Sequence, residues 1–372
     1  MLDQILRRAL EKKASDIHLK VGVRPVVRAD KGLEVLEEFP PLDSDIFEMF
    51  IDEVLGKHPK KKEELESKGQ VDVSYSIPKV SRFRVNIYRQ RGSYGMNLRV
   101  IPFDIPDFKR LNLPPVMFQT ALKHSAGLIL VTGPTGSGKS TTIASIINEI
   151  NKRLRKVIIT IEDPIEYLFK DVMSFIVQRE VGWDTESFLL GLRSALREDP
   201  DIIFVGEIRD TETAKTALHA AETGHLVFST LHTLDAIETV NRFVGMFPLE
   251  HRDQIRQMLA STLIAVYSQR LIPRRDKSGK IPVVEIMIMT QTIKEAILEN
   301  RLQDIPELIE KGKSVYGSQT FDQHLEELYK KGFIDMETAL LYARRPADLE
   351  LRLKGIGGTD ENILTEDDNF IM

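Results

Sequence analysis

The chain has 372 residues, of which 42% are hydrophobic and 29% are charged, and these values are typical of a globular protein with two domains. Its net charge of -5 provides no large basic field for nucleic acid, and the lack of cysteine excludes disulfides and thiolate zinc sites. It has no apolar run of the roughly 18 residues that a membrane span requires, and its charged N-terminus lacks the apolar core of a signal peptide. We therefore expect a cytoplasmic protein that reaches a membrane only through partners.

Residues 1–100 are predicted to form a small domain that mixes helix with antiparallel strands. Apolar residues recur at helical spacing near the N-terminus: Leu2, Ile5, Leu6 and Leu10. Apolar and polar residues alternate in three later segments, which predicts half-exposed strands: 70–77, 82–88 and 95–101. Gly92 and Gly95 are expected as turn residues of the hairpin between the last two strands, and the charged run 56–69 is expected to be a solvated helix.

A stretch rich in proline, residues 101–115, is predicted to be the linker to a second domain. Each proline removes a backbone donor and fixes φ, so regular structure should stop at this set: Pro102, Pro106, Pro114 and Pro115. Residues 116–345 are expected to form the second domain, in which helices dominate from about Leu249 onward. The acidic end, residues 346–372, is predicted to be a mobile tail.

The second domain has the pattern of an α/β fold. Continuous β-branched runs predict strands that are buried on both faces of a parallel sheet: 127–132, 156–162, 201–207 and 225–232. Helical patterns lie between these runs, and strand–helix alternation of this kind is typical of an α/β core.

The segment "GPTGSGKST" follows the first of these strands and opens a helix, which is the context of a phosphate-binding P-loop. It comprises Gly133, Pro134, Thr135, Gly136, Ser137, Gly138, Lys139, Ser140 and Thr141. The glycines let backbone N–H groups turn inward, and the helix N-terminus adds a favourable dipole for phosphate. We expect Lys139 to reach the β- and γ-phosphates of ATP and Ser140 to ligate Mg²⁺. The full G-x-x-x-x-G-K-S pattern disfavours the alternative of a glycine-rich turn that binds nothing.

Two further motifs follow later strands. "TIEDPIEY" places Glu162, Asp163 and Glu166 at a strand end, where parallel-sheet proteins put their sites. Three close carboxylates are costly unless cations neutralise them, and the alternative is a helix N-terminus that carries several acids. "GHLVFSTLHT" places His225 before a strand and His232 after it. A histidine after a strand can sense a phosphate or hydrogen-bond a catalytic water, whereas the alternative for both is a packed histidine.

The run "DIIFVGEIRD" ends a third strand in Gly206 and Glu207. Many ATPases carry an aspartate at this strand end to hold Mg²⁺ through water, and here that position is glycine. The run therefore raises the question of which carboxylate supplies the missing charge.

These motifs occur in the order seen in the secretion-superfamily ATPases of type II secretion and type IV pili, which the chain resembles over nearly its whole length. The early "ASDIHL", residues 14–19, also resembles the N-terminal signature of that family. Longer extension and secretion relatives carry a four-cysteine zinc element and an extra N-terminal domain. With no cysteine and few residues before Ala14, the chain most resembles the PilT-type retraction motors.

The resemblance implies a subunit with a PAS-like α/β N-terminal domain and a RecA-like P-loop ATPase domain that ends in a helical region. It implies a homo-hexamer that hydrolyses ATP to drive pilus retraction. ATP and Mg²⁺ are the implied cofactors, without zinc. The implied partner is the inner-membrane platform protein of the pilus machine, at the cytoplasmic face of that membrane, and no nucleic acid is expected.

The resemblance also implies roles for individual residues. Glu207 becomes the candidate general base, and the acidic box, Glu162 above all, completes the polarising set. We infer that Gly206, which has no side chain, leaves room for the carboxylates of the acidic box to approach. Arg84 and Arg99 match family positions that reach across a ring to the nucleotide of a neighbouring subunit.

The alternative for Arg84 and Arg99 is a solvated strand face, and this alternative carries more weight for Arg82 and Arg91. One segment departs from the family pattern. Retraction motors carry a C-terminal motif written AIRNLIRE, and the corresponding stretch here is "TIKEAILE", residues 292–299, with Lys294 and Leu298 in place of the two arginines.

Three alternative functions remain open. An extension or secretion ATPase shares the chemistry but is expected to need the zinc element. A nucleic-acid translocase would show turnover stimulated by DNA. A scaffold that binds nucleotide without hydrolysis would be expected to have lost Lys139 or Glu207, and both are present.

Overall fold

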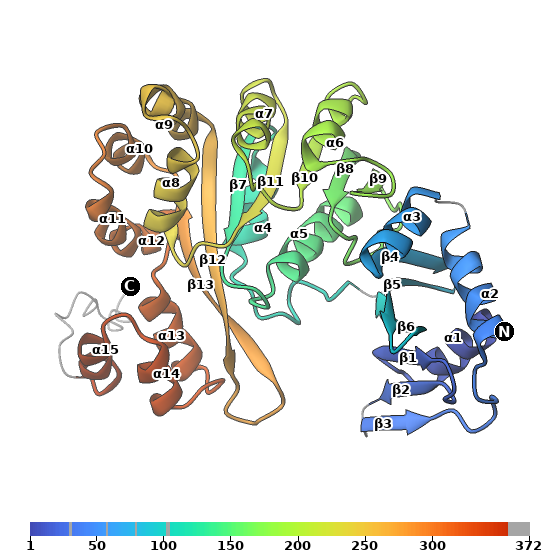
Figure 1. The fold of residues 1–372 in the computed structure, drawn as a ribbon. Helices are drawn as coiled ribbons and strands as arrows, with labels where there is room; N and C mark the ends of the chain where they lie inside the picture. The colour runs from blue at the N-terminus through green and yellow to red at the C-terminus, as the bar shows by residue number, and fades with distance from the viewer. Residues whose placement is uncertain (30–31, 57–58, 79, 102–104, 356–372) are drawn as a thin grey trace, which may run out of the picture.

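The computed structural model describes residues 1–29, 32–56, 59–78, 80–101 and 105–355 (Figure 1). The N-terminal region contains a six-stranded antiparallel sheet. Its strands lie in the order β3 (Gly32–Val35), β2 (Val26–Ala29), β1 (Asp16–Lys20), β6 (Ser93–Ile101), β5 (Ser81–Gln90) and β4 (Gln70–Ile77). Three helices accompany the sheet: α1 (Leu2–Glu11), α2 (Ser44–Leu55) and α3 (Pro59–Lys68). The apolar side chains of α1 and α2 pack with alternate residues of the strands into one core.

The second region is built on a seven-stranded sheet. Its order is β13 (Lys280–Ile288), β12 (Leu263–Pro273), β7 (Gly127–Thr132), β11 (Leu226–Leu231), β10 (Ile202–Val205), β8 (Val157–Glu162) and β9 (Phe175–Glu180). All neighbouring pairs are parallel except β12 with β13. The four strands predicted from β-branched runs are β7, β8, β10 and β11, and they are adjacent at the centre of the sheet and buried.

Helices cover both faces of this sheet. One face packs against α4 (Val116–Lys123) and α5 (Lys139–Arg153). The other face packs against α6 (Phe188–Ala195), α7 (Thr211–Glu222), α8 (Ala236–Gly245), α9 (Arg252–Thr262), α10 (Gln291–Leu298) and α11 (Ile305–Lys311). Two short 3₁₀ helices, η1 (Leu249–His251) and η2 (Leu302–Asp304), connect elements on this side. The fold is therefore the predicted mixture of two α/β regions.

The last helices form a separate small core. It joins α13 (Phe321–Lys330), α14 (Met336–Tyr342) and α15 (Pro346–Leu353) to the projecting ends of β12 and β13, and α12 (Lys313–Tyr316) precedes it. Figure 1 shows these helices beyond the end of the sheet, on the side opposite the N-terminal region. Among the described residues, no helix is both long enough and apolar enough to cross a membrane.

Several sequence expectations were wrong in detail. Gly95 lies within β6 instead of in a turn, because the hairpin closes through Arg91 and Gly92, both at positive φ. A Cβ on Gly95 would lie 2.6 Å from the Tyr88 ring, so this glycine permits a close contact across the strands. Helices do predominate beyond Leu249, as expected, but this part of the chain also holds β12 and β13, two strands of the sheet that were not predicted.

The boundaries also differ from expectation in two places. The tail predicted from residue 346 begins too early, because Pro346–Leu353 form α15 and Leu349 is fully buried. Residues 356–372 lie outside the described part of the chain. Residues 105–115 hold no helix or strand, in keeping with a linker, whereas 102–104, including Pro102, lie outside the described residues.

Candidate active site

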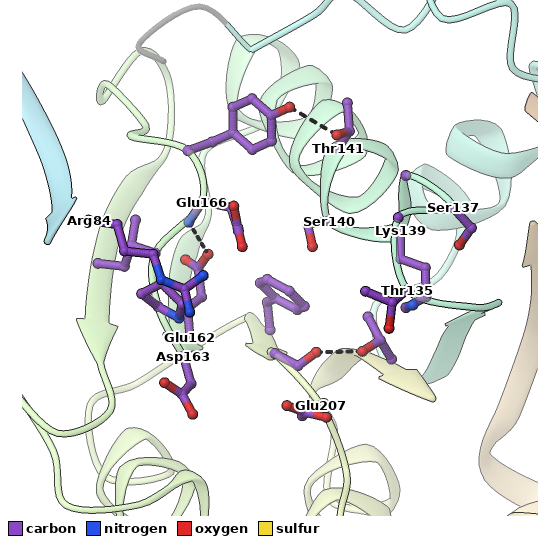
Figure 2. A pocket seen from close by; sticks show the side chains of 18 of the residues that line it. Arg84, Thr135, Ser137, Lys139, Ser140, Thr141, Glu162, Asp163, Glu166 and Glu207 are labelled. Carbon is purple, nitrogen blue, oxygen red and sulfur yellow. Dashed lines mark hydrogen bonds between the residues drawn. The ribbon is translucent and has the colours of Figure 1, made fainter. Parts of the chain in front are cut away.

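The four predicted motif loops meet at the side of the second sheet where its parallel strands have their carboxyl ends. Each follows the carboxyl end of a parallel strand, and the four strands are neighbours, so their loops converge. Here they border a pocket of about 650 Å³, a size typical of small-molecule sites. Figure 2 shows Lys139 and Ser140 on one side of this pocket and Glu162, Asp163, Glu166 and Arg84 on the other.

The P-loop is shaped by its glycines. Gly133, Gly136 and Gly138 have φ of 142°, 77° and 90°, a region that side chains with a Cβ rarely adopt. Lys139 is the first residue of α5 and is 8% exposed, and its Nζ donates to the carbonyl oxygens of Gly133 at 2.8 Å and Pro134 at 3.1 Å. Burial lowers the pKa of the Lys139 amine, and the charge of Glu207 acts in the opposite direction.

The loop is held from outside by Gln269 of β12, which sequence reasoning missed. Its Nε2 donates to the carbonyl oxygen of Ser137 at 2.7 Å, and its Oε1 accepts from Thr142 Oγ1 at 2.8 Å. A Cβ on Gly133 would lie 2.2 Å from the Gln269 carbonyl oxygen, so the strand and the loop are in tight contact. β12 was not predicted as a strand, and no motif marked this glutamine.

Glu162 ends β8 and is 6% exposed. Its Oε1 accepts from Thr160 Oγ1 at 2.6 Å and from Gln178 Nε2 at 3.1 Å. Burial raises the pKa of the Glu162 carboxyl to about 7, although these hydrogen bonds oppose the shift. Burial therefore favours the protonated form of Glu162 at pH values below about 7.

The remaining residues of the acidic loop face the same space. Asp163 and Glu166 line the pocket, and the Glu166 N–H points toward Glu162 Oε2 at 3.5 Å. The hydroxyl of Tyr167 lies 2.9 Å from that of Thr141, so the acidic loop touches the first turn of α5. The three predicted carboxylates are thus brought together opposite the P-loop.

Glu207 lies on the loop after β10 and forms an ion pair with Arg209. His232 Nε2 lies 3.6 Å from the second carboxylate oxygen of Glu207, and all three residues line the pocket. The hydrogen bond from Arg209 to Glu207 raises the pKa of the Arg209 guanidinium. Arg209 is a pocket residue that sequence reasoning missed, although it lies within the quoted run "DIIFVGEIRD".

Gly206 lies where two strands approach closely. Its N–H donates to the Ile161 carbonyl oxygen at 2.7 Å. A Cβ at this position would lie 3.2 Å from that oxygen and 3.4 Å from Glu162 Cα. The glycine therefore lets the loop that carries Glu207 lie against the end of β8, as the inference from the sequence requires.

Two arginines of the N-terminal sheet line the pocket from the opposite region. Arg84 of β5 and Arg99 of β6 are paired across the two strands. Arg99 Nε donates to Asp16 Oδ1 at 2.9 Å, whereas Arg84 forms no ion pair within the described part of the chain. The structure thus places both predicted arginines beside the motif loops of their own chain.

His225 does not lie in the pocket. It precedes β11 and so lies at the opposite edge of the sheet, where its Nδ1 is 2.9 Å from the Ala220 carbonyl oxygen at the end of α7. His225 was a candidate for a supporting role in the histidine box, and its position away from the pocket favours the packed alternative instead. His232, which follows the same strand, occupies the pocket edge as predicted.

Comparison with known proteins is consistent with this geometry. The family of type II/IV secretion system proteins matches residues 1–332. The type IV pilus retraction ATPase PilT of Pseudomonas aeruginosa is 41% identical over 345 residues, which cover 93% of this chain and 98% of that protein. A twitching motility protein of Neisseria gonorrhoeae is 41% identical, and the match covers 85% of this chain and 83% of that protein.

The crystal structure of the pilus retraction motor PilT with bound ADP is similar to this fold. It shares 48% identity and has a TM-score of 0.83, with 93% of this chain and 98% of that chain covered. The P-loop, the acidic loop and the Glu207 loop line one pocket. The chain therefore belongs to the type II/IV secretion system protein family and is an ATP-hydrolysing enzyme of its PilT type.

Proposed function

We propose that this protein is the motor that retracts type IV pili, and that it works as a homo-hexameric ring driven by ATP hydrolysis. The observation that carries this proposal is the pocket itself, in which two N-terminal arginines face the four motif loops of the ATPase sheet. The likeness to PilT over nearly the whole chain supports retraction as the output.

The P-loop residues are suited to hold the nucleotide. Lys139 can exchange its bonds to two loop carbonyls for bonds to phosphate oxygens, and the N–H groups around Gly136 and Gly138 complete the cradle. No cluster of three acidic or histidine side chains able to hold a metal by itself occurs among the described residues. Mg²⁺ fits a different arrangement, with the exposed Ser140 hydroxyl as its protein ligand and phosphate oxygens as the others.

Glu207 is the proposed general base. It lines the pocket, where an attacking water would be placed between it and the γ-phosphate, and His232 lies beside it. Glu162 lies opposite the P-loop and adds charge when it is ionised, which compensates for the aspartate that Gly206 replaces. The ion pair with Arg209 holds Glu207 in one orientation.

Arg84 and Arg99 are the proposed cations for the transferred phosphate. Such arginines are often delivered by a neighbouring subunit in multimeric ATPases. Arg84 has no ion pair within the described residues, so its guanidinium is available for this purpose. In the single subunit these arginines border the pocket of their own chain, so the proposal requires the ring to bring the N-terminal region of each subunit to the nucleotide of the next. Hydrolysis would then depend on domain movement.

The surface proposed to transmit the domain movement to the pilus machine includes α10. This helix buries Ile293, Ala296 and Ile297 and turns Leu298 outward, at 39% exposure. The proposed partner is the inner-membrane platform protein of the pilus machine, which would place this protein at the cytoplasmic face of that membrane. Because lysine is a point charge and leucine has none, the contact at Lys294 and Leu298 must differ from a bidentate arginine contact.

The test is deletion of the gene followed by complementation. Cells without the protein should carry abundant surface pili that cannot shorten and should lose twitching. The unaltered gene should restore twitching, and the Lys139→Ala variant should not. Cells that instead lose their pili would identify an extension motor and contradict the proposal.

A further inference from the structure

Glu180, the last residue of β9, is a buried carboxylate outside all the motifs and is 4% exposed. Its Oε1 accepts from the Ser74 hydroxyl of β4. Its Oε2 accepts from Arg82 Nη2 of β5 at 2.9 Å and from the backbone N–H of Ile165 at 3.0 Å. One carboxylate therefore joins two strands of the N-terminal sheet to a loop of the ATPase sheet.

The loop that it holds is the acidic one. Glu180 pairs with Glu162 in the register of β9 and β8, and Ile165 lies between the pocket residues Asp163 and Glu166. The same oxygen of Glu180 accepts from Arg82 and from Ile165. A displacement of Arg82 that moves this oxygen therefore also changes the hydrogen bond to Ile165.

The segment after Glu180 also touches the N-terminal region. Trp183 packs against the core of the N-terminal domain. A Cβ on Gly182 would lie 3.9 Å from Lys61 Nζ of α3. The end of β9 is therefore a docking point for the N-terminal domain, and it is continuous in the sheet with the strand that carries Glu162.

Low exposure makes partial separation of the Arg82–Glu180 pair unfavourable. The side chains of Arg82 and Glu180 are only 16% and 5% exposed, so separating them would leave two charges that water reaches poorly. Such a pair favours two discrete states, docked or fully separated and hydrated, over a graded displacement. Arg82 is thus a partly buried interdomain residue, and the alternative of a solvated strand face does not apply to it.

We propose that Glu180 is a positioning residue that couples the docking of the N-terminal domain to the placement of the acidic loop in the ATPase pocket. When Arg82 and Ser74 are engaged, Glu180 holds the Ile165 N–H and with it the carboxylates on either side. When the N-terminal domain leaves, the loop loses this support and the pocket loses its arrangement for hydrolysis. The inference rests on the proposed catalytic use of that pocket, but not on pilus retraction.

The test measures turnover, nucleotide affinity and domain separation in the full-length assembled protein. Glu180→Gln and Arg82→Gln should lower kcat by about ten- to a hundredfold, because misplaced polar groups cost this much in other enzymes. The affinity for ADP should change little, because the P-loop is supported by Gln269 from another strand. Arg82→Lys keeps the charge and should retain more of the parent kcat than Arg82→Gln.

The matched control is Glu198→Gln. Glu198 is also a carboxylate beside β9, but it is exposed, and its side-chain partners among the described residues, Arg179 at 3.1 Å and Ser194, both belong to the ATPase region. This variant should keep the parent kcat. If Glu180→Gln lowers kcat no more than Glu198→Gln does, the coupling is refuted.

Distance measurement separates coupling from a general loss of structure. Because the chain has no cysteine, spin labels can be attached at Ser67→Cys of α3 and Lys215→Cys of α7, both exposed positions. Doubly labelled subunits diluted with unlabelled ones report the separation within one subunit. The parent and Glu198→Gln should give one narrow distance distribution without nucleotide, and Glu180→Gln and Arg82→Gln a broadened one. A narrow, unshifted distribution in both latter variants would overturn the proposal, whatever the outcome of the pilus experiments.

Discussion

Glu207 and Arg209 lie two residues apart on one loop and form an ion pair at the edge of the nucleotide pocket. The guanidinium holds the carboxylate of Glu207 beside His232, whose Nε2 is 3.6 Å from the other carboxylate oxygen. The proposed base is therefore oriented by a neighbour on each side. This arrangement separates the proposed base, Glu207, from Lys139, the residue proposed to hold phosphate.

The first prediction follows from that separation. Lys139→Ala should lose nucleotide binding, because it removes the charge that faces the phosphates. Glu207→Gln should keep binding and lose about 10²- to 10⁴-fold in turnover, because the amide preserves shape but is no base. Steady-state ATPase assays beside nucleotide titrations distinguish the two effects, and near-normal turnover by Glu207→Gln would refute its assignment.

The second prediction concerns the subunit that supplies the arginines. Arg84→Ala alone and Glu207→Gln alone should each be weak ATPases. If Arg84 acts on a neighbouring nucleotide, mixed rings of the two variants should recover activity, because some interfaces pair an intact arginine with an intact glutamate. Rings mixed from Glu207→Gln and the double variant serve as the control and should stay inactive. Lack of recovery in verified mixed rings would show that the arginine acts within its own chain or does not act in hydrolysis.

The third prediction concerns the pH dependence of stability. Burial raises the pKa of Glu162 from its ordinary 4.5 to about 7. A carboxyl whose pKa is higher in the folded state binds a proton on folding, so its stabilisation is present at low pH and is lost as the pH rises through about 7. Between pH 5 and pH 8 the parent should lose about 2 to 3 kcal/mol of folding free energy through this group.

Glu162→Gln should lack this loss, because its amide does not titrate. The free energy of unfolding of the variant relative to the parent should therefore rise between pH 5 and pH 8, as measured by urea titration without nucleotide. Equal pH slopes for the two proteins would show that Glu162 does not titrate in this range.

The fourth prediction tests the space at Gly206. A Cβ there would lie 3.1 Å from Phe188 and 3.2 Å from the Ile161 carbonyl oxygen, so Gly206→Ala should cost about 1 to 3 kcal/mol of stability and reduce turnover. Gly245→Ala is the control, because Gly245 ends α8 and a Cβ added there would have nothing within 4 Å. That variant should gain up to about 1 kcal/mol from the lower entropy of its unfolded chain. Equal stability of the two variants would argue against crowding at Gly206.

The central strands of the sheet and the motif loops of the pocket could be predicted from the sequence, because the patterns that mark them lie within short segments of the chain. The P-loop residues through Lys139 follow a continuous β-branched run, and the glycine positions report the backbone shape directly. β12 and β13 were missed because their apolar runs lie in a region interpreted as helical, although the turn residues near Gly279 separate them.

The roles of Gln269, Arg82 and Glu180 could not be predicted in the same way. Each acts through a partner that is far away in the sequence, as Glu180 does with Ser74 and Arg82. A lone glutamate at the end of a weakly apolar strand carries no local sign of burial. The burial of Glu180 becomes visible only when the N-terminal region is packed against β9.

The position of β7 in the sheet has a consequence for the order in which the chain folds during synthesis. Its two hydrogen-bonded neighbours are β11, which begins at Leu226, and β12, which ends at Pro273. The N-terminal sheet, by contrast, has all its strands by Ile101. A nascent chain can therefore complete its first domain early, whereas the nucleotide loop stays incomplete until the strand that carries Gln269 has left the ribosome. Long-range pairing of this kind is slow to form, so the emerging ATPase region exposes apolar strands for an extended part of translation.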